Sequence, residues 1–530
     1  MIVVHTTVMH ARSGYRLVPS LLPYAPLVFI LVLSACHVFS VCYSQPKGIP
    51  AAATKWVGTW STAPQLVEPG NMPPAPGLTN NSLRQIVRVS IGGDTLRARF
   101  SNEFSAAAVT MKSVQIAVST GAGTIDVSTN KELKFNGSSE VTMSAGIAVT
   151  SDPVAFTLTP RIDVAITIYF GQSSATVTGH PGSRTTSYIL AGNTTTTTDF
   201  TGAVTTDHWY TINAIDVLAP STASCAAILG NSITDGRGST TNLQNRWPDV
   251  FSESLLKDSS TQQVGVLNLG IGGNSVLSGG LGPTGASRYD RDILNQSGVR
   301  WAIVFEGVND IGGVNSAAGA TSTANNLIAA YTQMIIKAHA RNIKIYGATI
   351  LPFNGNAYYN QYSELCRSTV NQWIRTKGNY DRCIDFDKVM RNPQDTTRLM
   401  STYQNDGLHP DAAGYKTMGE SIDLNLFTGP DTTTLGVNSV NAIHSYALGQ
   451  NFPNPFNPST VFPFSLPSRS FVSLKVYDSL GRKVATVVSE ELPAGEYMRE
   501  WNAANVSSGC YYYRQQASSY IETKKLLLLK

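Results

Sequence analysis

The stretch Ala226-Ala227-Ile228-Leu229-Gly230-Asn231-Ser232-Ile233-Thr234-Asp235-Gly236 decides the fold class of the central part of this chain. It opens with a short apolar run and continues into glycine and polar residues, which is typical of a buried strand that turns into a helix. Similar runs follow at Val264–Leu269, Trp301–Phe305, Ile343–Ile350 and Cys383–Phe386. The segments between them are long enough for helices, with candidates at Pro248–Lys257, Thr323–Ala340 and Tyr362–Lys377. The pattern predicts a parallel sheet in a three-layer α/β domain over residues 220–428.

The preceding region, from Trp56 to Ala219, is rich in Thr, Ser, Val and Gly and alternates polar with apolar residues. One face of a predicted strand carries Ile162, Val164, Ile166, Ile168 and Phe170. The segment Val87–Phe100 predicts a hairpin that turns at Gly92-Gly93-Asp94, and Thr194–Thr198 predicts an exposed loop or edge. We therefore expect a β-sandwich accessory domain over residues 52–219.

Composition argues against two classes of protein. The 530 residues are 42% hydrophobic and 14% charged, so a buried core is expected rather than intrinsic disorder. The net charge is +4, and Arg12, Arg16 and Lys47 near the N-terminus supply three of these charges. The remainder is almost neutral and has no clustered basic stripe, which argues against a nucleic-acid partner.

The N-terminus has the features of an export signal. An uncharged stretch runs from Leu17 to Pro46, and its apolar centre, Ala25–Ala35, has the length of a signal peptide rather than of a membrane span. We expect a signal peptide over residues 1–44, with a membrane anchor as the alternative. Ordinary cleavage at the end of this range and a lipoprotein-type cleavage that leaves Cys36 lipidated are both compatible with the sequence.

Four cysteines remain for the mature chain, which are too few for a disulfide scaffold and too sparse for a metal site. We expect neither a metal nor a cofactor. Cys366 and Cys383 lie on a predicted helix and the next predicted strand, and a disulfide between them is compatible with export.

Candidate catalytic residues follow three of the predicted strands. Ser232 lies in the turn after the first strand, Gly273 in a glycine-rich loop after the second, and Asn309 after the third. Because the carboxyl ends of parallel strands meet at one edge of a sheet, these residues are candidates for a shared site. Taken singly, each has an ordinary explanation as a helix cap or a tight turn.

A general base completes this set. Of the eight histidines, three lie in the leader, two in the β-rich region, one on a predicted helix and one in a linker, which leaves His409. A serine nucleophile needs a base, an acid that orients the base, and N–H donors for the developing oxyanion. Ser232, His409, Asp406, Gly273 and Asn309 fill these roles between them.

These residues lie in four sequence blocks, at Ser232, at Gly273, at Asn309 and at Asp406–His409. The four blocks together resemble the SGNH hydrolases, also called the GDSL family of esterases and lipases. The resemblance implies a flavodoxin-like SGNH hydrolase domain in which Ser232 is the nucleophile and a backbone oxyanion donor. It makes Gly273 the second oxyanion donor and Asn309 the side-chain donor, while Asp406 and His409 complete the triad.

One position departs from this family. Asn231 stands where the family usually has Asp before the serine, and we expect altered rigidity of the loop rather than inactivity. Further candidate cleft residues are Arg237, Arg246, Trp247, Arg288 and Asp290.

A polar linker over residues 429–446 leads to a final β-rich unit over residues 447–530. This unit resembles the C-terminal sorting domain of the type IX secretion pathway. The matching segments are Gln450–Pro458, Val476-Tyr477-Asp478, Leu480-Gly481-Arg482, Ala494-Gly495, Trp501, Ser508-Gly509 and Lys530. The resemblance implies a C-terminal β-sandwich, the type IX machinery as a partner, and a secreted or cell-surface protein. A small carbohydrate-binding sandwich is the alternative.

These observations predict a secreted serine esterase that cleaves carboxylic esters through an acyl-enzyme. The region opening with Trp56–Ser61 is similar to the leading segment of a subgroup of these esterases, many of which act on decorated polysaccharides. That similarity favours short acyl groups, especially acetyl esters on polysaccharides. A broad-specificity lipase or a polyester-cleaving esterase would use the same triad, and the non-enzyme alternative is a surface carbohydrate-binding protein. The sequence does not determine the oligomeric state.

Overall fold

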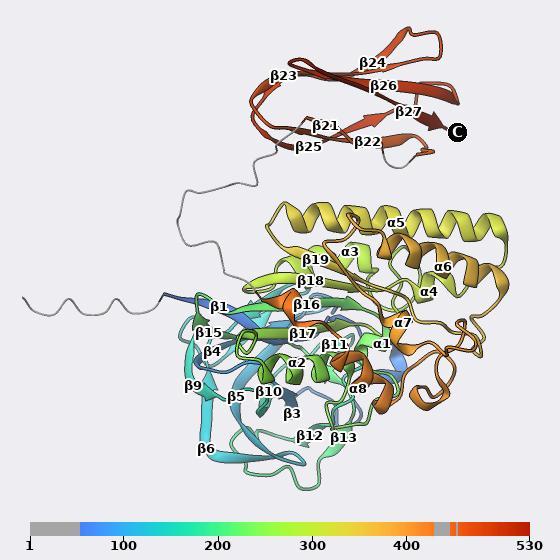
Figure 1. Cartoon of the computed structure of the whole chain (residues 1–530). Coiled ribbons are helices and arrows are strands. Elements are labelled where there is room, and N and C mark those ends of the chain that lie inside the picture. Colours follow the sequence, from blue (N-terminus) through green and yellow to red (C-terminus); the bar gives the residue numbers. More distant parts are fainter. Residues whose placement is uncertain (1–52, 429–445, 452–453, 530) are drawn as a thin grey trace, which may run out of the picture. The chain divides into compact units, whose positions relative to one another are not determined.

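The computed structural model describes residues 53–428, 446–451 and 454–529 (Figure 1). The expected signal peptide over residues 1–44, including Cys36, and nearly all of the expected linker lie outside these residues. Within the described residues, no helix is both long enough and apolar enough to cross a membrane.

The central sheet contains five parallel strands in the order β17, β16, β18, β19, β20. All five apolar runs predicted as strands form strands, although the last is shorter than predicted because α7 (Phe386–Met390) begins at Phe386. The strands are β16 (Ser224–Gly230), β17 (Val264–Gly270), β18 (Val299–Phe305), β19 (Lys344–Ala348) and β20 (Arg382–Ile384).

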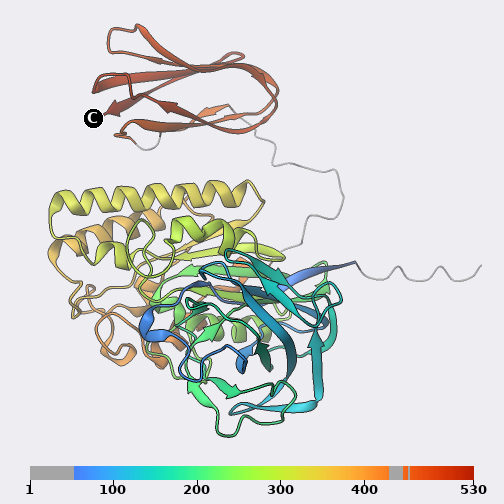
Figure 2. The same ribbon diagram turned by 180° about the vertical axis from the view of Figure 1, so that it is seen from behind.

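Helices pack against both faces of this sheet (Figure 1, Figure 2). Successive side chains of a strand point to opposite faces, and β16 shows the consequence. Cys225, Ala227 and Leu229 join the core beneath α5 and α6, whereas Ala226 and Ile228 join a second core with α2 and α8. The predicted long helices are confirmed as α2 (Trp247–Lys257), α5 (Ala317–His339) and α6 (Gln361–Arg375), and α8 (Ala412–Glu420) follows late in the domain.

Short helical turns complete this part of the chain. They are α1 (Ser232–Asp235), α3 (Gly285–Tyr289), η2 (Asp290–Leu294), α4 (Val308–Ile311), η3 (Ser401–Tyr403) and η4 (Leu424–Phe427). Two of them, α1 and α4, follow shortly after β16 and β18, so they bring polar side chains to the carboxyl edge of the sheet.

Three antiparallel sheets precede the α/β domain. The first contains β1 (Thr54–Ser61), β15 (Ile212–Pro220), β4 (Gly93–Ser101), β8 (Ala148–Thr150) and β9 (Val154–Leu158). The second contains β13 (Val204–Thr206), β12 (Ser187–Ala191), β3 (Asn81–Arg88), β10 (Asp163–Phe170), β5 (Val109–Gly121), β6 (Thr124–Leu133) and β7 (Val141–Met143). A small third sheet joins β14 (Trp209–Tyr210), β11 (Thr178–His180) and β2 (Gln65–Leu66).

The hairpin predicted over Val87–Phe100 is wrong. Its two strands, β3 and β4, belong to different sheets, where β3 pairs with β10 and β12 while β4 pairs with β15. A Cβ on Gly92 would lie 2.3 Å from the Leu158 carbonyl oxygen, and one on Gly93 would lie 2.4 Å from Val217 Cγ2. These glycines therefore permit close contact with β9 and β15, the neighbours of β4 in its own sheet, rather than a hairpin turn. The loop predicted at Thr194–Thr198 is confirmed between β12 and β13, where Thr196 to Thr198 are exposed but Thr195 is buried.

The N-terminal sheets and the α/β domain share a hydrophobic core. Buried residues of both belong to one cluster, which includes Val57 on β1 and Leu267 on β17. The backbones approach closely, because a Cβ on Gly265 would lie 2.4 Å from the Gly58 carbonyl oxygen. A hydrogen bond from Val266 N to Ser90 Oγ, at 3.0 Å, joins the two parts further. The N-terminal sheets are therefore packed into the same folded unit as the central sheet.

The C-terminal unit is a β-sandwich of two antiparallel sheets. One contains β21 (Ala447–Leu448), β22 (Ser459–Leu466) and β25 (Gly495–Asn502), and the other contains β24 (Lys483–Leu492), β23 (Ser470–Tyr477), β26 (Gly509–Ala517) and β27 (Tyr520–Leu528). Its buried apolar residues, which include Phe462, Leu474 and Tyr513, form a cluster drawn entirely from residues 448–528. This unit therefore has a core of its own.

Cys225, Cys366, Cys383 and Cys510 are free thiols. The disulfide considered between Cys366 and Cys383 is therefore wrong. A disulfide requires two Cα atoms within roughly 7 Å, and placement on a helix and on the next strand does not by itself ensure this.

Candidate active site

Ser232 lies at the turn from β16 into α1, just beyond the carboxyl end of a central strand. Asn231 caps this short helix, because its side-chain oxygen accepts a hydrogen bond from Ile233 N at 3.1 Å. Position 230 requires glycine, since a Cβ there would lie 2.1 Å from the Thr234 hydroxyl oxygen. The local sequence thus holds Ser232 at the first helical position, where its N–H has no partner within the helix.

The side chains of Ser232, His409 and Asp406 form a continuous chain of hydrogen bonds. Ser232 Oγ lies 2.9 Å from His409 Nε2, and His409 Nδ1 lies 2.8 Å from Asp406 Oδ2. Asp406 Oδ1 also accepts from the backbone N–H of His409 at 2.8 Å. The carboxylate therefore orients both the ring and the backbone of the histidine, as a general base next to a nucleophile requires.

Protonation of this group follows from its burial and hydrogen bonds. Burial lowers the pKa of His409 below its ordinary value, and the Asp406 carboxylate opposes that effect without overcoming it. Burial by itself would raise the pKa of Asp406, but hydrogen bonds from the backbone and ring of His409 outweigh it and hold that pKa below the usual range. At neutral pH the imidazole can therefore accept a proton, and the carboxylate is ionised.

Gly273 and Asn309 come from the segments that follow β17 and β18. Gly273 has a φ of +69°, and its N–H donates to no other atom among the described residues. The Asn309 amide donates to the Asn274 carbonyl oxygen at 2.7 Å, while Tyr358 Oη donates to Asn309 Oδ1 at 3.1 Å. An amide nitrogen carries two N–H groups, so these contacts orient the side chain and leave a second donor.

One pocket of about 420 Å³ is lined by a residue from each of the four sequence blocks. These residues are Ser232, Gly273, Asn309 and His409. Asp406 stands behind His409 as its partner. The structure thus brings together all five residues singled out in the sequence. The pocket also receives residues from the N-terminal sheets, among them Gln65, Glu68, Asn71, Arg184 and His208.

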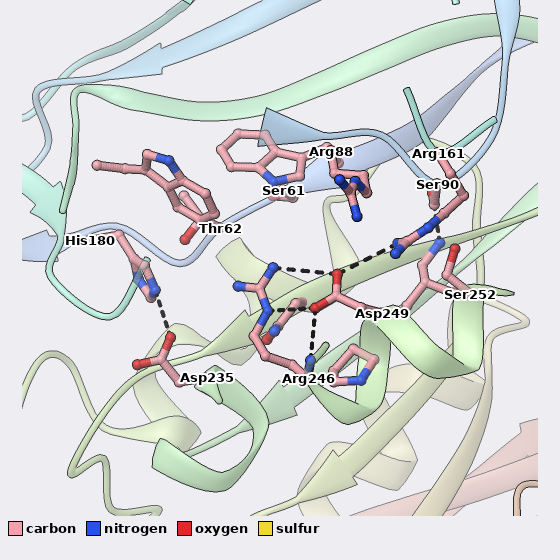
Figure 3. Close-up of a pocket in the computed structure, with 15 residues that line it drawn as sticks. Ser61, Thr62, Arg88, Ser90, Arg161, His180, Asp235, Arg246, Asp249 and Ser252 are labelled. Carbon is pink, nitrogen blue, oxygen red and sulfur yellow. Dashed lines mark hydrogen bonds and ion pairs between the residues drawn. The ribbon is translucent and has the colours of Figure 1, made fainter. Parts of the chain in front are cut away.

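His180, at the end of β11, joins the N-terminal sheets to the helix that carries Ser232 (Figure 3). Its Nε2 lies 2.8 Å from Asp235 Oδ1, and its Nδ1 lies 3.0 Å from the Ala63 carbonyl oxygen. Both members of the His180–Asp235 pair are buried, at 3% and 1% exposure. The pair is therefore shielded from solvent and holds the last residue of α1, three positions after Ser232.

Next to this pair lies a polar cavity of about 30 Å³, which is large enough for a water molecule but not for a substrate (Figure 3). Asp249 on α2 faces it and accepts a hydrogen bond from Arg246 Nε at 2.6 Å. Arg161, from the N-terminal sheets, lies 3.6 Å from the same carboxylate. Burial would raise the pKa of Asp249, but the two arginines hold it below its ordinary value. This cavity belongs to the interface between the two parts, and neither Ser232 nor His409 lines it.

Of the candidate cleft residues, Arg237 alone lines the pocket. Arg246 pairs with Asp249, Trp247 is part of the core, and Asp290 pairs with Lys337 at the surface. Arg288 is fully buried and donates to the Leu269 and Gly230 carbonyl oxygens at 2.6 and 2.9 Å. It therefore supports the ends of the two strands that precede Ser232 and Gly273.

Asn231 has a specific partner in this structure. Its side-chain nitrogen donates to Glu306 Oε2 at 3.1 Å. Burial raises the pKa of Glu306 to about 8, although Arg288 lies 3.5 Å away and opposes this. An aspartate at position 231 would place a second carboxyl group against Glu306, whereas the amide donates a hydrogen bond to it.

Reasoning from the sequence missed His180, Arg184 and Tyr358, which contact or line the site. The first two belong to the N-terminal sheets and the third to a loop after β19. No motif marks them, and only the fold places them near Ser232.

Comparison with known proteins gives two family matches. Residues 228–417 match the GDSL-like Lipase/Acylhydrolase family, and residues 450–529 match the Secretion system C-terminal sorting domain. No curated protein matches the chain. The two family matches together cover the α/β domain and the C-terminal unit.

Several solved structures are similar to part of this chain. A putative acylhydrolase from Bacteroides fragilis is 20% identical over 37% of this chain and 83% of its own, with a TM-score of 0.27. An acetyl xylan esterase, AlAXEase, is 21% identical over 37% and 96%, with a TM-score of 0.28. A catalytic mutant of an acetylxylan esterase from Geobacillus stearothermophilus is 16% identical over 38% and 92%, with a TM-score of 0.29.

Proposed function

The chain carries a GDSL-like lipase/acylhydrolase domain and is a carboxylic ester hydrolase, and we propose that Ser232, His409 and Asp406 are its catalytic triad. The observation that carries this proposal is the hydrogen-bonded chain from Ser232 Oγ through the His409 ring to the Asp406 carboxylate. It supplies a nucleophile, a base and an orienting acid in one pocket.

In the proposed reaction, Ser232 Oγ attacks the ester carbonyl carbon while His409 Nε2 takes the hydroxyl proton. The N–H groups of Ser232 and Gly273 and the amide of Asn309 donate to the oxyanion of the tetrahedral intermediate. The intermediate collapses, and the leaving alcohol takes the proton from His409. Water then attacks the acyl-enzyme with His409 again as the base, which releases the carboxylic acid and restores Ser232.

The test is covalent capture of the nucleophile. A fluorophosphonate probe should label the wild-type enzyme at one serine, and mass spectrometry of the digest should place the label on the peptide that contains Ser232. Label on a different serine, or hydrolysis of 4-nitrophenyl acetate by a Ser232→Ala variant at the wild-type rate, would contradict the proposal.

Short acyl esters, especially acetyl esters on polysaccharides, are the proposed substrates. The similarity of the leading region to polysaccharide-active esterases supports this, and so do the polar side chains that line the pocket. A broad-specificity lipase or polyester-cleaving activity is the alternative. Rates on 4-nitrophenyl esters from acetate to palmitate separate the two, because a lipase should favour the long chains.

The sorting domain directs export through type IX secretion to the cell surface or the extracellular space. We also propose the full domain division, with a β-sandwich over residues 52–219, a three-layer flavodoxin-like catalytic domain over residues 220–428, a linker to residue 446 and the sorting domain from residue 447. The shared core argues that the first two of these fold together.

A further inference from the structure

Two arginines from different parts of the chain line the pocket that contains Ser232 and His409. Arg184 comes from the loop between β11 and β12, and Arg237 lies two residues after the end of α1. Both also act electrostatically on His409, which places their charges close to the reacting centre.

The backbone of Arg184 is held in a defined position. It has a φ of +52°, which a non-glycine residue seldom adopts, and its carbonyl oxygen accepts from Asn242 N at 3.0 Å. Gly182, two residues earlier, is packed so tightly that a Cβ would lie 1.7 Å from Asp235 Oδ2. The Arg184 side chain is half-buried, yet its Nε has no hydrogen-bond partner among the described residues.

Arg237 is also anchored through its backbone. Its N–H donates to the Ser232 carbonyl oxygen at 2.9 Å, and its own carbonyl oxygen accepts from Tyr415 Oη at 2.6 Å. Its side chain is exposed. The guanidinium can therefore reach a ligand at the pocket while its Cα stays fixed relative to the nucleophile.

Neither arginine forms an ion pair with a carboxylate among the described residues. Arg161 and Arg246, which lie nearby in the interface, both pair with Asp249. The acidic residues that line the pocket are engaged elsewhere: Glu68 accepts from Gln65 and Asn71, and Asp235 from His180. The pocket thus presents two guanidinium groups that form no ion pair with a carboxylate of the described residues.

We propose that Arg184 and Arg237 form a subsite for a carboxylate on the substrate, so that the preferred substrates are acyl esters of acidic, uronate-bearing polysaccharides. The inference rests on the proposed function of Ser232. Guanidinium groups bind carboxylates through paired, charge-assisted hydrogen bonds, which makes two unpaired arginines beside a nucleophile suited to an anionic ester.

The pocket lining favours a polysaccharide over a lipid. Apart from Pro181, Leu281 and Leu408, the side chains that line it are mostly polar or aromatic. A fatty acyl chain would need a continuous apolar channel, whereas a sugar acid needs hydrogen-bonding groups and positive charge. The pocket volume of about 420 Å³ lies within the range typical of small-molecule sites.

The experiment measures an anion preference, defined as kcat/KM for an anionic ester divided by kcat/KM for its neutral counterpart. The soluble pair is 4-acetoxybenzoate and 4-acetoxybenzamide, and the polymer pair is acetylated polygalacturonate and acetylated neutral xylan. Measurements at pH 8 keep His409 deprotonated in every variant. We expect the wild-type enzyme to prefer the anionic member of each pair, and sodium chloride to reduce that preference.

Arg184→Gln and Arg237→Gln should each lower the anion preference by about 10- to 100-fold, the usual effect of removing a hydrogen bond to a charged group. The matched control is Arg382→Gln, an exposed arginine on β20 that does not line this pocket and should leave the ratio unchanged. Because the preference is a ratio within one preparation, partial loss of folded enzyme does not alter it. Unacetylated polygalacturonate should also inhibit the wild-type enzyme more strongly than either variant.

Two results would overturn the inference. One is a wild-type enzyme with no preference for anionic esters, and the other is an anion preference that both arginine variants retain. Faster cleavage of phosphatidylglycerol vesicles than of acetylated polygalacturonate, lost in the arginine variants, would replace the polysaccharide with a lipid and also overturn it. Failure of the proposed function looks different, since a Ser232→Ala variant would then remain active on both members of each pair.

Discussion

The two β-rich regions of this chain have opposite relations to the reacting centre. The N-terminal sheets share a hydrophobic core with the α/β domain and place His180 beside α1, which carries Ser232, and Arg184 at the pocket that Ser232 lines. The C-terminal sandwich encloses a core drawn only from its own residues. Both regions consist mainly of strands, but the contacts of their buried side chains differ. Among the described residues, only the N-terminal sheets share a core with the α/β domain.

The largest loss of activity is expected from substitutions in the proposed triad. Ser232→Ala and His409→Ala should each lower kcat by roughly 10⁴- to 10⁶-fold, and the double variant should lose little more, because the two residues act as a unit. Initial rates with 4-nitrophenyl acetate check this, and circular dichroism serves as the control for folding. Substantial activity in both single variants would end the assignment.

Substitution of Asn309 tests a proposed oxyanion donor whose side chain is hydrogen-bonded to Asn274 and Tyr358 of the α/β domain. Asn309→Ala should lower kcat by about 10²- to 10³-fold, because one oxyanion donor is lost. Tyr358→Phe removes only the hydrogen bond to Asn309 Oδ1 and should have a smaller effect in the same assay. An unchanged kcat in a folded Asn309→Ala variant would place the oxyanion hole elsewhere.

His180 tests the N-terminal region itself. His180→Ala leaves the Asp235 carboxylate buried without its partner, so we expect kcat to fall by about 10- to 100-fold and the thermal midpoint to fall as well. His180→Gln, which restores a donor, should recover part of both. His339→Ala, at an exposed histidine on α5, is the control. Wild-type kcat and thermal midpoint in His180→Ala would show that the N-terminal region does not support the nucleophile helix.

The pH profile tests another effect of the N-terminal region, the influence of Arg184 on the pKa of His409. Burial lowers the pKa of His409 and Asp406 raises it, while Arg184 and Arg237 also lower it. The base form is the active one, so kcat/KM for a neutral ester should rise with pH, with its midpoint below the usual pKa of a histidine. Loss of the positive charge in Arg184→Gln should raise the pKa of His409 and move the midpoint upward. A midpoint that moves down would contradict the placement of Arg184.

The smallest effect is expected from the C-terminal unit. Truncation after Thr433 should leave kcat for 4-nitrophenyl acetate unchanged in the purified enzyme, because none of the proposed catalytic residues lies beyond His409. In the native host the truncated protein should fail to reach the surface or the medium, since the sorting domain is gone. Loss of activity on small soluble esters would make this unit part of the catalytic structure. Loss on insoluble polysaccharide alone would favour carbohydrate binding.

Much of the fold was predictable from local pattern. The apolar runs, such as Trp301–Phe305, and the helices between them are set by burial on both faces of a parallel sheet, which leaves a clear signature along the chain. The pairing of β3 with β10 rather than with β4 was not predictable, because alternation reports which face of a strand is buried and not which strand lies beside it. For the same reason, the alternation pattern did not predict the contact of the N-terminal sheets with α1.

The sequence by itself determined which residues we propose as catalytic. Ser232, Gly273, Asn309 and the Asp406–His409 pair stand at the ends of predicted strands or in a short motif, and parallel strands bring their carboxyl ends to one edge. Only the tertiary structure decided that His180 holds Asp235 and that Arg184 and Arg237 face the same pocket. These contacts join segments some 50 residues apart in different sheets and helices, and such long-range packing leaves no local periodicity to read.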